Sequence, residues 1–262
     1  MIVIVSLGSA GCSFSVDWFR RFRAARAIQM QDYDAALKIY EGIINENPDS
    51  PKALEAARRG AKIALFEAKN YPVAVDFYKH VILSSPDAEE RKAAQKAIAQ
   101  IQFEDTQNFD QAVIEYEKLL KLDNRPEEAF RYRLNLAKAQ MQMNNIDQAV
   151  AEIDLLLAQK HSADEAFEAR VLKANTLIAA KRMGDAADSW QEILKEFPEK
   201  SKKENVALNL VVLYEDMKEF AKAIQILESM REGYPHPDFL DVRIQRLRER
   251  MGNQPGAQGL KR

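Results

Sequence analysis

One spacing pattern occurs six times along the chain and limits the folds that it can adopt. Each copy places a small alanine shortly after a polar turn, and these alanines are Ala36, Ala74, Ala112, Ala149, Ala186 and Ala223. Successive alanines are separated by 38, 38, 37, 37 and 37 residues. A bulky side chain follows each alanine by four residues: Tyr40, Tyr78, Tyr116, Ile153, Trp190 and Leu227. A regular period of this length is typical of a protein built from stacked copies of one unit.

The residues of each copy favour a helical hairpin. Good helix formers dominate the chain, and runs with the alternation of a β-strand are missing from the sequence. A small alanine lets two helices approach closely, and the bulky residue four positions later lies on the same face of its helix. In four copies a proline follows twelve residues after the alanine and ends the second helix: Pro48, Pro86, Pro198 and Pro235. A single hairpin cannot bury its apolar stripe alone, so neighbouring hairpins must stack.

These residues resemble the tetratricopeptide repeat (TPR) family over residues 18–237. The resemblance implies an all-α fold, a right-handed α-α superhelix (a TPR solenoid) with six helical hairpins of 37–38 residues. The family repeat is about 34 residues long, so each hairpin has one extra turn. Three start signals predict that this turn lengthens the first helix: Ser50-Pro51, Ser162 to Glu165 and Ser201 to Glu204.

The C-terminal part of the chain differs from the repeats. Residues 238–251 carry the apolar stripe Leu240, Ile244, Leu247 and Met251 among charged residues, which predicts a capping helix. Residues 252–262 contain three glycines and one proline, which predicts a flexible basic tail. From Arg243 onward there are six cations and one acid. This charge is either a solvated chain end or a docking site for an acidic partner.

The single cysteine, Cys12, follows an apolar segment and a few small residues. Residues 1–12 resemble a bacterial lipoprotein signal, in which the cysteine is lipidated and becomes the mature N-terminus. The resemblance implies a short tether over residues 13–17 and a lipid anchor on the periplasmic face of the outer membrane, because Ser13 and not an aspartate follows the cysteine. Nearby arginines would then face lipid headgroups or water. In the alternative interpretation, the chain is cytoplasmic and Cys12 is a buried free thiol.

No motif of the sequence predicts catalysis. The three histidines, His80, His161 and His236, lie near the ends of different repeats, where we expect them to cap helix ends. HExxH, GxSxG, glycine-rich phosphate loops and calcium loops do not occur in the sequence. We therefore expect no enzyme activity, cofactor, metal site or small-molecule substrate. The near balance of 38 basic and 40 acidic residues argues against nucleic-acid binding.

The TPR resemblance also implies a binding groove. In that family the first helices line the concave surface, and asparagines there bind the backbone of an extended peptide. Three asparagines match these positions: Asn135, Asn175 and Asn209. Four apolar residues have offsets that should face the same groove: Ile63, Phe66, Met141 and Ile178. An amide both donates and accepts hydrogen bonds, as a peptide backbone requires. In the alternative interpretation, the asparagines are only solvated or bonded between adjacent repeats.

The function expected from these features is a non-enzymatic scaffold for protein–protein interaction. The chain resembles bacterial outer-membrane TPR lipoproteins, which implies that it binds an extended or helical segment of a partner protein and assists assembly of a cell-envelope complex. The alternative is a soluble cytoplasmic adaptor in motility or signalling.

Overall fold

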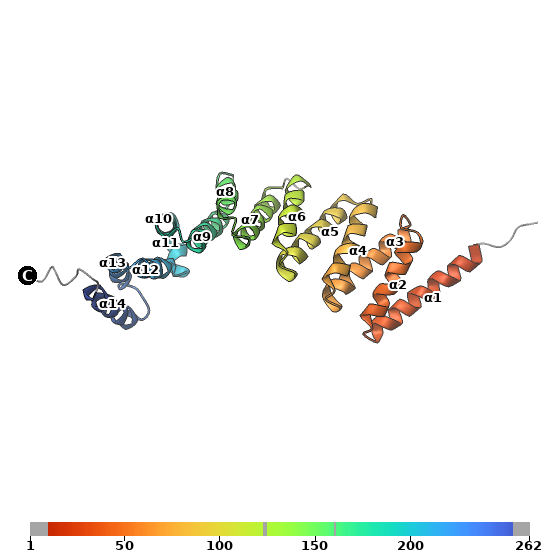
Figure 1. Ribbon diagram of the computed structural model, residues 1–262, viewed down its shortest axis with the longest axis horizontal. Helices are drawn as coiled ribbons and strands as arrows, with labels where there is room; N and C mark the ends of the chain where they lie inside the picture. Colours follow the sequence, from red (N-terminus) through yellow and green to blue (C-terminus); the bar gives the residue numbers. More distant parts are fainter. Residues whose placement is uncertain (1–9, 123–124, 160, 254–262) are drawn as a thin grey trace, which may run out of the picture. The chain divides into compact units, whose positions relative to one another are not determined.

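The computed structural model describes residues 10–122, 125–159 and 161–253, with side chains from residue 18 onward. These residues form α-helices and two π-helical turns and no strand (Figure 1). The chain divides into two compact units, unit 1 (Met1–Asn124) and unit 2 (Arg125–Arg262), and each is described by itself. Most of the expected signal segment and of the basic tail lies outside the described residues.

Unit 1 contains three hairpins, in which each helix packs against its neighbours along the chain. The first helices of the second and third hairpins each continue into a π-helical turn, η1 or η2. The elements are α1 (Ala10–Gln29), α2 (Tyr33–Glu46), α3 (Pro51–Lys62), η1 (Ile63–Glu67), α4 (Tyr71–Ser84), α5 (Ala88–Gln100), η2 (Ile101–Asp105) and α6 (Phe109–Leu122). Helix α1 begins at Ala10, so it includes residues 13–17, which the sequence assigned to a short tether.

Unit 2 contains three further hairpins and a final helix. The first helix of its third hairpin is divided into the short α11 and the longer α12. The elements are α7 (Pro126–Gln142), α8 (Ile146–Leu157), α9 (Ala163–Ala179), α10 (Met183–Glu196), α11 (Pro198–Lys203), α12 (Val206–Asp216), α13 (Phe220–Met230) and α14 (Pro237–Gly252). Helix α14 packs on α13 and buries three residues of the expected stripe, which makes it the capping helix that the sequence predicts.

The six alanines of the sequence pattern occupy equivalent positions. Each is the fourth residue of the second helix of its hairpin, and each is fully buried at 0% exposure. The bulky residues four positions later are buried, apart from Tyr78, which is half-buried. The prediction of six helical hairpins of 37–38 residues in an all-α repeat fold is therefore confirmed.

The turn between the two helices also repeats. Five residues before each alanine, the backbone has a positive φ of 50° to 60°, at Gln31, Lys69, Gln107, Asn144, Lys181 and Lys218. Between α9 and α10, the Lys181 N–H donates to the Ile178 carbonyl (2.9 Å) and the Arg182 N–H donates to the Leu177 carbonyl (2.9 Å). These two bonds form a Schellman motif, which satisfies carbonyls at the end of the first helix. None of these six left-handed positions is a glycine.

The π-helical turns account for the two longer repeats. The 38-residue intervals are those that contain η1 and η2, whereas the described helices in the 37-residue intervals lack such a turn. After η1, the Asn70 N–H donates to the Ala64 carbonyl, six residues earlier (2.7 Å). The equivalent residue after α9, Arg182, donates to the Leu177 carbonyl, which is only five residues earlier. A π-helical turn absorbs one additional residue without changing the face that the helix buries.

Two of the three predicted helix starts are confirmed. Ser50 accepts a hydrogen bond from the Ala53 N–H, with Pro51 in the first turn. Ser162 and Glu165 form a complete capping box. The third prediction, a capping box at Ser201, is wrong. Ser201 lies inside α11, is buried, and donates to the Ile193 carbonyl (3.2 Å), so its hydroxyl joins α11 to the end of α10.

Candidate interaction surfaces

The three predicted groove asparagines all lie on first helices of unit 2, but they differ in exposure. Asn175 on α9 and Asn209 on α12 are exposed, so their amides are accessible to a ligand. Asn135 on α7 is half-buried and already has an interaction within the protein. Although Asn135 and Asn209 share one register in their repeats, only Asn209 presents its side chain to solvent.

The four predicted apolar residues do not form one described surface. Ile63 and Phe66 belong to η1 in unit 1, while Met141 and Ile178 belong to α7 and α9 in unit 2. Three of them are half-buried and pack against the hydrophobic cores. Phe66 differs, because 66% of it is exposed. Among these four residues, Phe66 is therefore the one that presents most of its side chain to a ligand.

A hollow at the end of unit 2 was not anticipated from the sequence. It has a volume of about 700 Å³ and lies between α12 and α14, with Glu215, Phe239, Val242 and Arg246 among its lining residues. Phe239 and Val242 are about half exposed, at 54% and 51%. They form a second apolar stripe on α14, three residues apart, beside the buried stripe that identifies the capping helix. That second stripe is the sequence signal for this hollow.

The charges around this hollow are partly compensated. Glu215 on α12 forms ion pairs with Arg243 (2.7 Å) and Arg250 (3.3 Å), both on α14. The Arg250 guanidinium also lies 4.6 Å from the centre of the Phe220 ring. Arg246 points from the same helix and has no ion pair with the described side chains. Among the described side chains, one cation, Arg246, and one acid, Asp238, therefore remain without an ion pair beside the apolar pair of α14.

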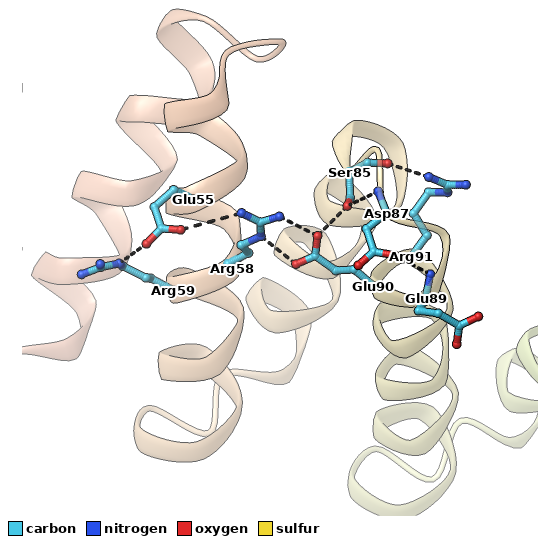
Figure 2. A network of polar contacts seen from close by, with 8 residues as sticks. All are labelled: Glu55, Arg58, Arg59, Ser85, Asp87, Glu89, Glu90 and Arg91. Carbon is cyan, nitrogen blue, oxygen red and sulfur yellow. Dashed lines mark hydrogen bonds and ion pairs between the residues drawn. The ribbon is translucent and has the colours of Figure 1, made fainter.

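The polar network of α3 and α5 in unit 1 joins two hairpins (Figure 2). Arg58 donates two hydrogen bonds of 2.6 Å to the Glu90 carboxylate, which also accepts one from Ser85 (2.5 Å). The bonds from Arg58 are the largest cause of the lowered pKa of Glu90, and the Ser85 bond adds to it. Glu90 in turn raises the pKa of Arg58. Because these charges satisfy one another, we interpret the network as structural.

The described residues were also searched for a metal site and for a helix that could span a membrane. Among the described residues, no group of three or more His, Cys, Asp or Glu side chains could hold a metal ion. His161 lies 3.1 Å from the Leu157 carbonyl at the end of α8, in the helix-capping position expected from the sequence. None of the described helices combines the length and the apolar character needed to cross a membrane.

Comparison with known families gives the same repeat that the geometry shows. Models described as tetratricopeptide repeat match residues 21–50 and residues 134–201. Both segments contain hairpins with a buried alanine at the fourth position of the second helix. The chain contains tetratricopeptide repeats. Nothing in a search of curated proteins matches it.

Solved structures of similar fold are distant in sequence from this TPR protein. The complex described as Naa15/Naa10 bound to HypK-THB superposes with a TM-score of 0.55 at 16% identity, over 88% of this chain and 38% of the other. A tetratricopeptide repeat protein from Parabacteroides merdae ATCC 43184 has a TM-score of 0.49 at 16% identity, over 89% and 88%. MamA has a TM-score of 0.47 at 14% identity, over 70% and 93%. At these identities the likeness concerns the fold alone.

Proposed function

We propose that this TPR protein is a non-enzymatic scaffold of the cell envelope, and that unit 2 binds an extended or helical segment of a partner protein. The observation that carries the proposal is the exposure of Asn175 and Asn209 on the first helices of successive hairpins. Asparagine is a mediocre residue for a helix interior, because its amide competes for backbone hydrogen bonds. An exposed amide on such a helix can donate to and accept from a peptide backbone.

The hollow beside α14 supplies the chemistry that would select the partner. Phe239 and Val242 offer an apolar surface, and Arg246 adds a positive charge without a carboxylate partner among the described side chains. A segment with an apolar residue next to an acidic one would bury the first against Phe239 and pair the second with Arg246. We therefore expect the partner segment to be apolar and acidic.

The position of Cys12 after an apolar run supports a lipid anchor, which would place the scaffold on the periplasmic face of the outer membrane. A partner held there would be an envelope protein, and the bound segment would assist assembly of an envelope complex. The alternative is a soluble cytoplasmic adaptor. Fractionation of cells that produce the parent chain or Cys12→Ser tests the anchor. The anchor is supported if the parent chain is found in the membrane fraction and the variant in a soluble fraction. It is rejected if both chains are found in the cytoplasm.

The groove is tested by cross-linking in cells with Asn175→Ala combined with Asn209→Ala. The partners captured by the parent should be lost from this double variant, with little change in thermal stability because both amides are exposed. Asn45→Ala is the matched control, since Asn45 is an exposed helical asparagine on α2, a second helix. Unchanged partners for the double variant would reject the peptide-binding role of unit 2.

A further inference from the structure

Helix α1 presents a group of exposed aromatic side chains. Trp18, Phe19 and Phe22 are 63%, 54% and 52% exposed. The rings of Trp18 and Phe22 stack one helical turn apart, with their centres separated by 5.6 Å. The Arg23 guanidinium lies 5.9 Å from the centre of the Phe19 ring. A cluster of three large exposed aromatic residues on one helix marks an interaction surface.

The opposite face of α1 attaches it to the protein. Ala24 is buried at 1% exposure, and Ile28, one turn later, is half-buried. Arg20 forms an ion pair with Glu46 at the end of α2. With 3.6 residues per turn, Phe22 and Arg26 point away from this attached side. The packing of the first hairpin therefore does not use the aromatic face.

The charge of this face is uncompensated. Helix α1 contains four arginines and one acidic residue, Asp17, and from Trp18 onward it contains no acidic residue. Arg21, Arg23 and Arg26 form no ion pair with any described side chain, whereas arginines on α14 pair with Glu215 and Glu228. We define the α1 face as Trp18, Phe19, Phe22, Arg23 and Arg26. It combines aromatic rings with free cations, and its ligand must be apolar and anionic at once.

We propose that the α1 face binds the surface of an anionic lipid bilayer directly. Tryptophan and phenylalanine insert at the level of the headgroups, and arginines on the same helix pair with anionic lipids. A second copy of the chain fits less well, because a symmetric contact would bring two sets of unpaired arginines together. The proposal uses no residue of the unit 2 surface, and it requires no lipid on Cys12.

The experiment uses the full chain with Cys12→Ser, purified without lipid, and vesicles of phosphatidylcholine with or without phosphatidylglycerol. The chain has two tryptophans, and Trp190 is buried at 1% exposure, so Trp18 dominates any change in solvent access. We expect binding to the anionic vesicles with a blue shift of the emission and protection from acrylamide. Binding should weaken as salt rises from 0.05 to about 0.5 M, because screening reduces the arginine contribution.

Two variants test the two components of the face. Phe19→Ser with Phe22→Ser removes apolar surface, and Arg23→Glu with Arg26→Glu reverses charge. Each should weaken binding to anionic vesicles by about tenfold or more. Matched controls are Leu83→Ser, at an exposed leucine of α4, and Lys38→Glu with Lys62→Glu, at exposed lysines of α2 and α3. The controls should bind like the parent.

Several outcomes would overturn the proposal. One is equal binding to neutral and anionic vesicles, and another is parent-like binding by both α1 variants, which would assign the affinity to another segment. Absence of vesicle binding would direct the search to an acidic protein. A concentration-dependent dimer that Phe19→Ser with Phe22→Ser abolishes would identify a second copy as the occupant. Circular dichroism of each variant establishes that the hairpins remain folded.

Discussion

Gly60 on α3 lies directly against the ring of Phe77 on α4. A Cβ atom added to Gly60 would be 2.6 Å from Cζ of Phe77, which is itself buried at 3% exposure. Glycine is normally unfavourable inside a helix, by about 1 kcal/mol relative to alanine. Here it permits the two helices of a hairpin to approach with a whole aromatic ring between them, so packing outweighs helix propensity.

Gly60→Ala should therefore destabilise the protein, by a net amount of about 1 kcal/mol or more, because the ring must move in a packed core. Gly42→Ala is the control. Gly42 lies inside α2 with no neighbouring atom within 4 Å of an added Cβ, so this change should stabilise by about 0.5–1 kcal/mol. Urea denaturation followed by circular dichroism measures both. A stabilising Gly60→Ala would contradict the packing argument.

The buried alanines give a second prediction. Ala149 on α8 is fully buried, whereas Ala151, two residues later on the same helix, is exposed. Ala149→Leu must separate α7 and α8 and should lower the free energy of unfolding by about 1–3 kcal/mol. Ala151→Leu should change it by less than about 0.5 kcal/mol. Equal effects of the two substitutions, measured by urea midpoints, would show that the alanine is not at a tight helix crossing.

The π-helical turns predict where the chain tolerates a deletion. Removing Glu67 from η1 converts a 38-residue interval into a 37-residue interval, and the first helix can then end as α9 does. We expect this variant to fold and to retain cooperative unfolding. Removing Ala179 from α9 leaves no extra residue to absorb the loss, and should destabilise the chain severely. The comparison needs thermal denaturation of the two deletion variants beside the parent, and the reverse order of stability would refute the assignment.

The Arg58–Glu90 pair makes part of the stability depend on pH. The folded-state pKa of Glu90 is lowered, mainly by hydrogen bonds from Arg58. Its contribution is complete above the ordinary glutamate pKa of about 4.3 and is lost as the pH falls through the lower folded value. Glu90→Gln should be less stable than the parent at pH 7, and should lose less stability on going to pH 3. Glu104→Gln, at an exposed residue of η2, should keep the pH dependence of the parent.

The repeat could be predicted from the sequence because its signals are local. A small alanine and a bulky residue four positions later share a helix face wherever they occur, so Ala149 and Ile153 mark a buried stripe before any packing is known. The same reasoning gave the helix starts at Ser50 and Ser162. It failed at Ser201, because a serine that reaches back to the Ile193 carbonyl has the same local sequence signature as a helix cap.

The candidate surfaces were less predictable. Asn135 and Asn209 have the same offset from their alanines, yet one is half-buried with an interaction and the other is exposed. The exposure of a side chain depends on which residues of the neighbouring hairpins pack against it. The spacing of residues within one repeat does not specify these contacts. For the same reason Met141 and Ile178 pack into the cores, although their offsets suggested a groove.

The amino-acid sequence alone determined that this chain is a stack of helical hairpins, because periodic helix faces follow from residue spacing. Tertiary structure decided which side chains remain available. It assigned Glu215 to two arginines of α14 and left Arg246 without a carboxylate among the described side chains. It also left the aromatic residues of α1 exposed. Pairing and burial depend on contacts between residues far apart in the chain, and these distances exist only once the helices have packed.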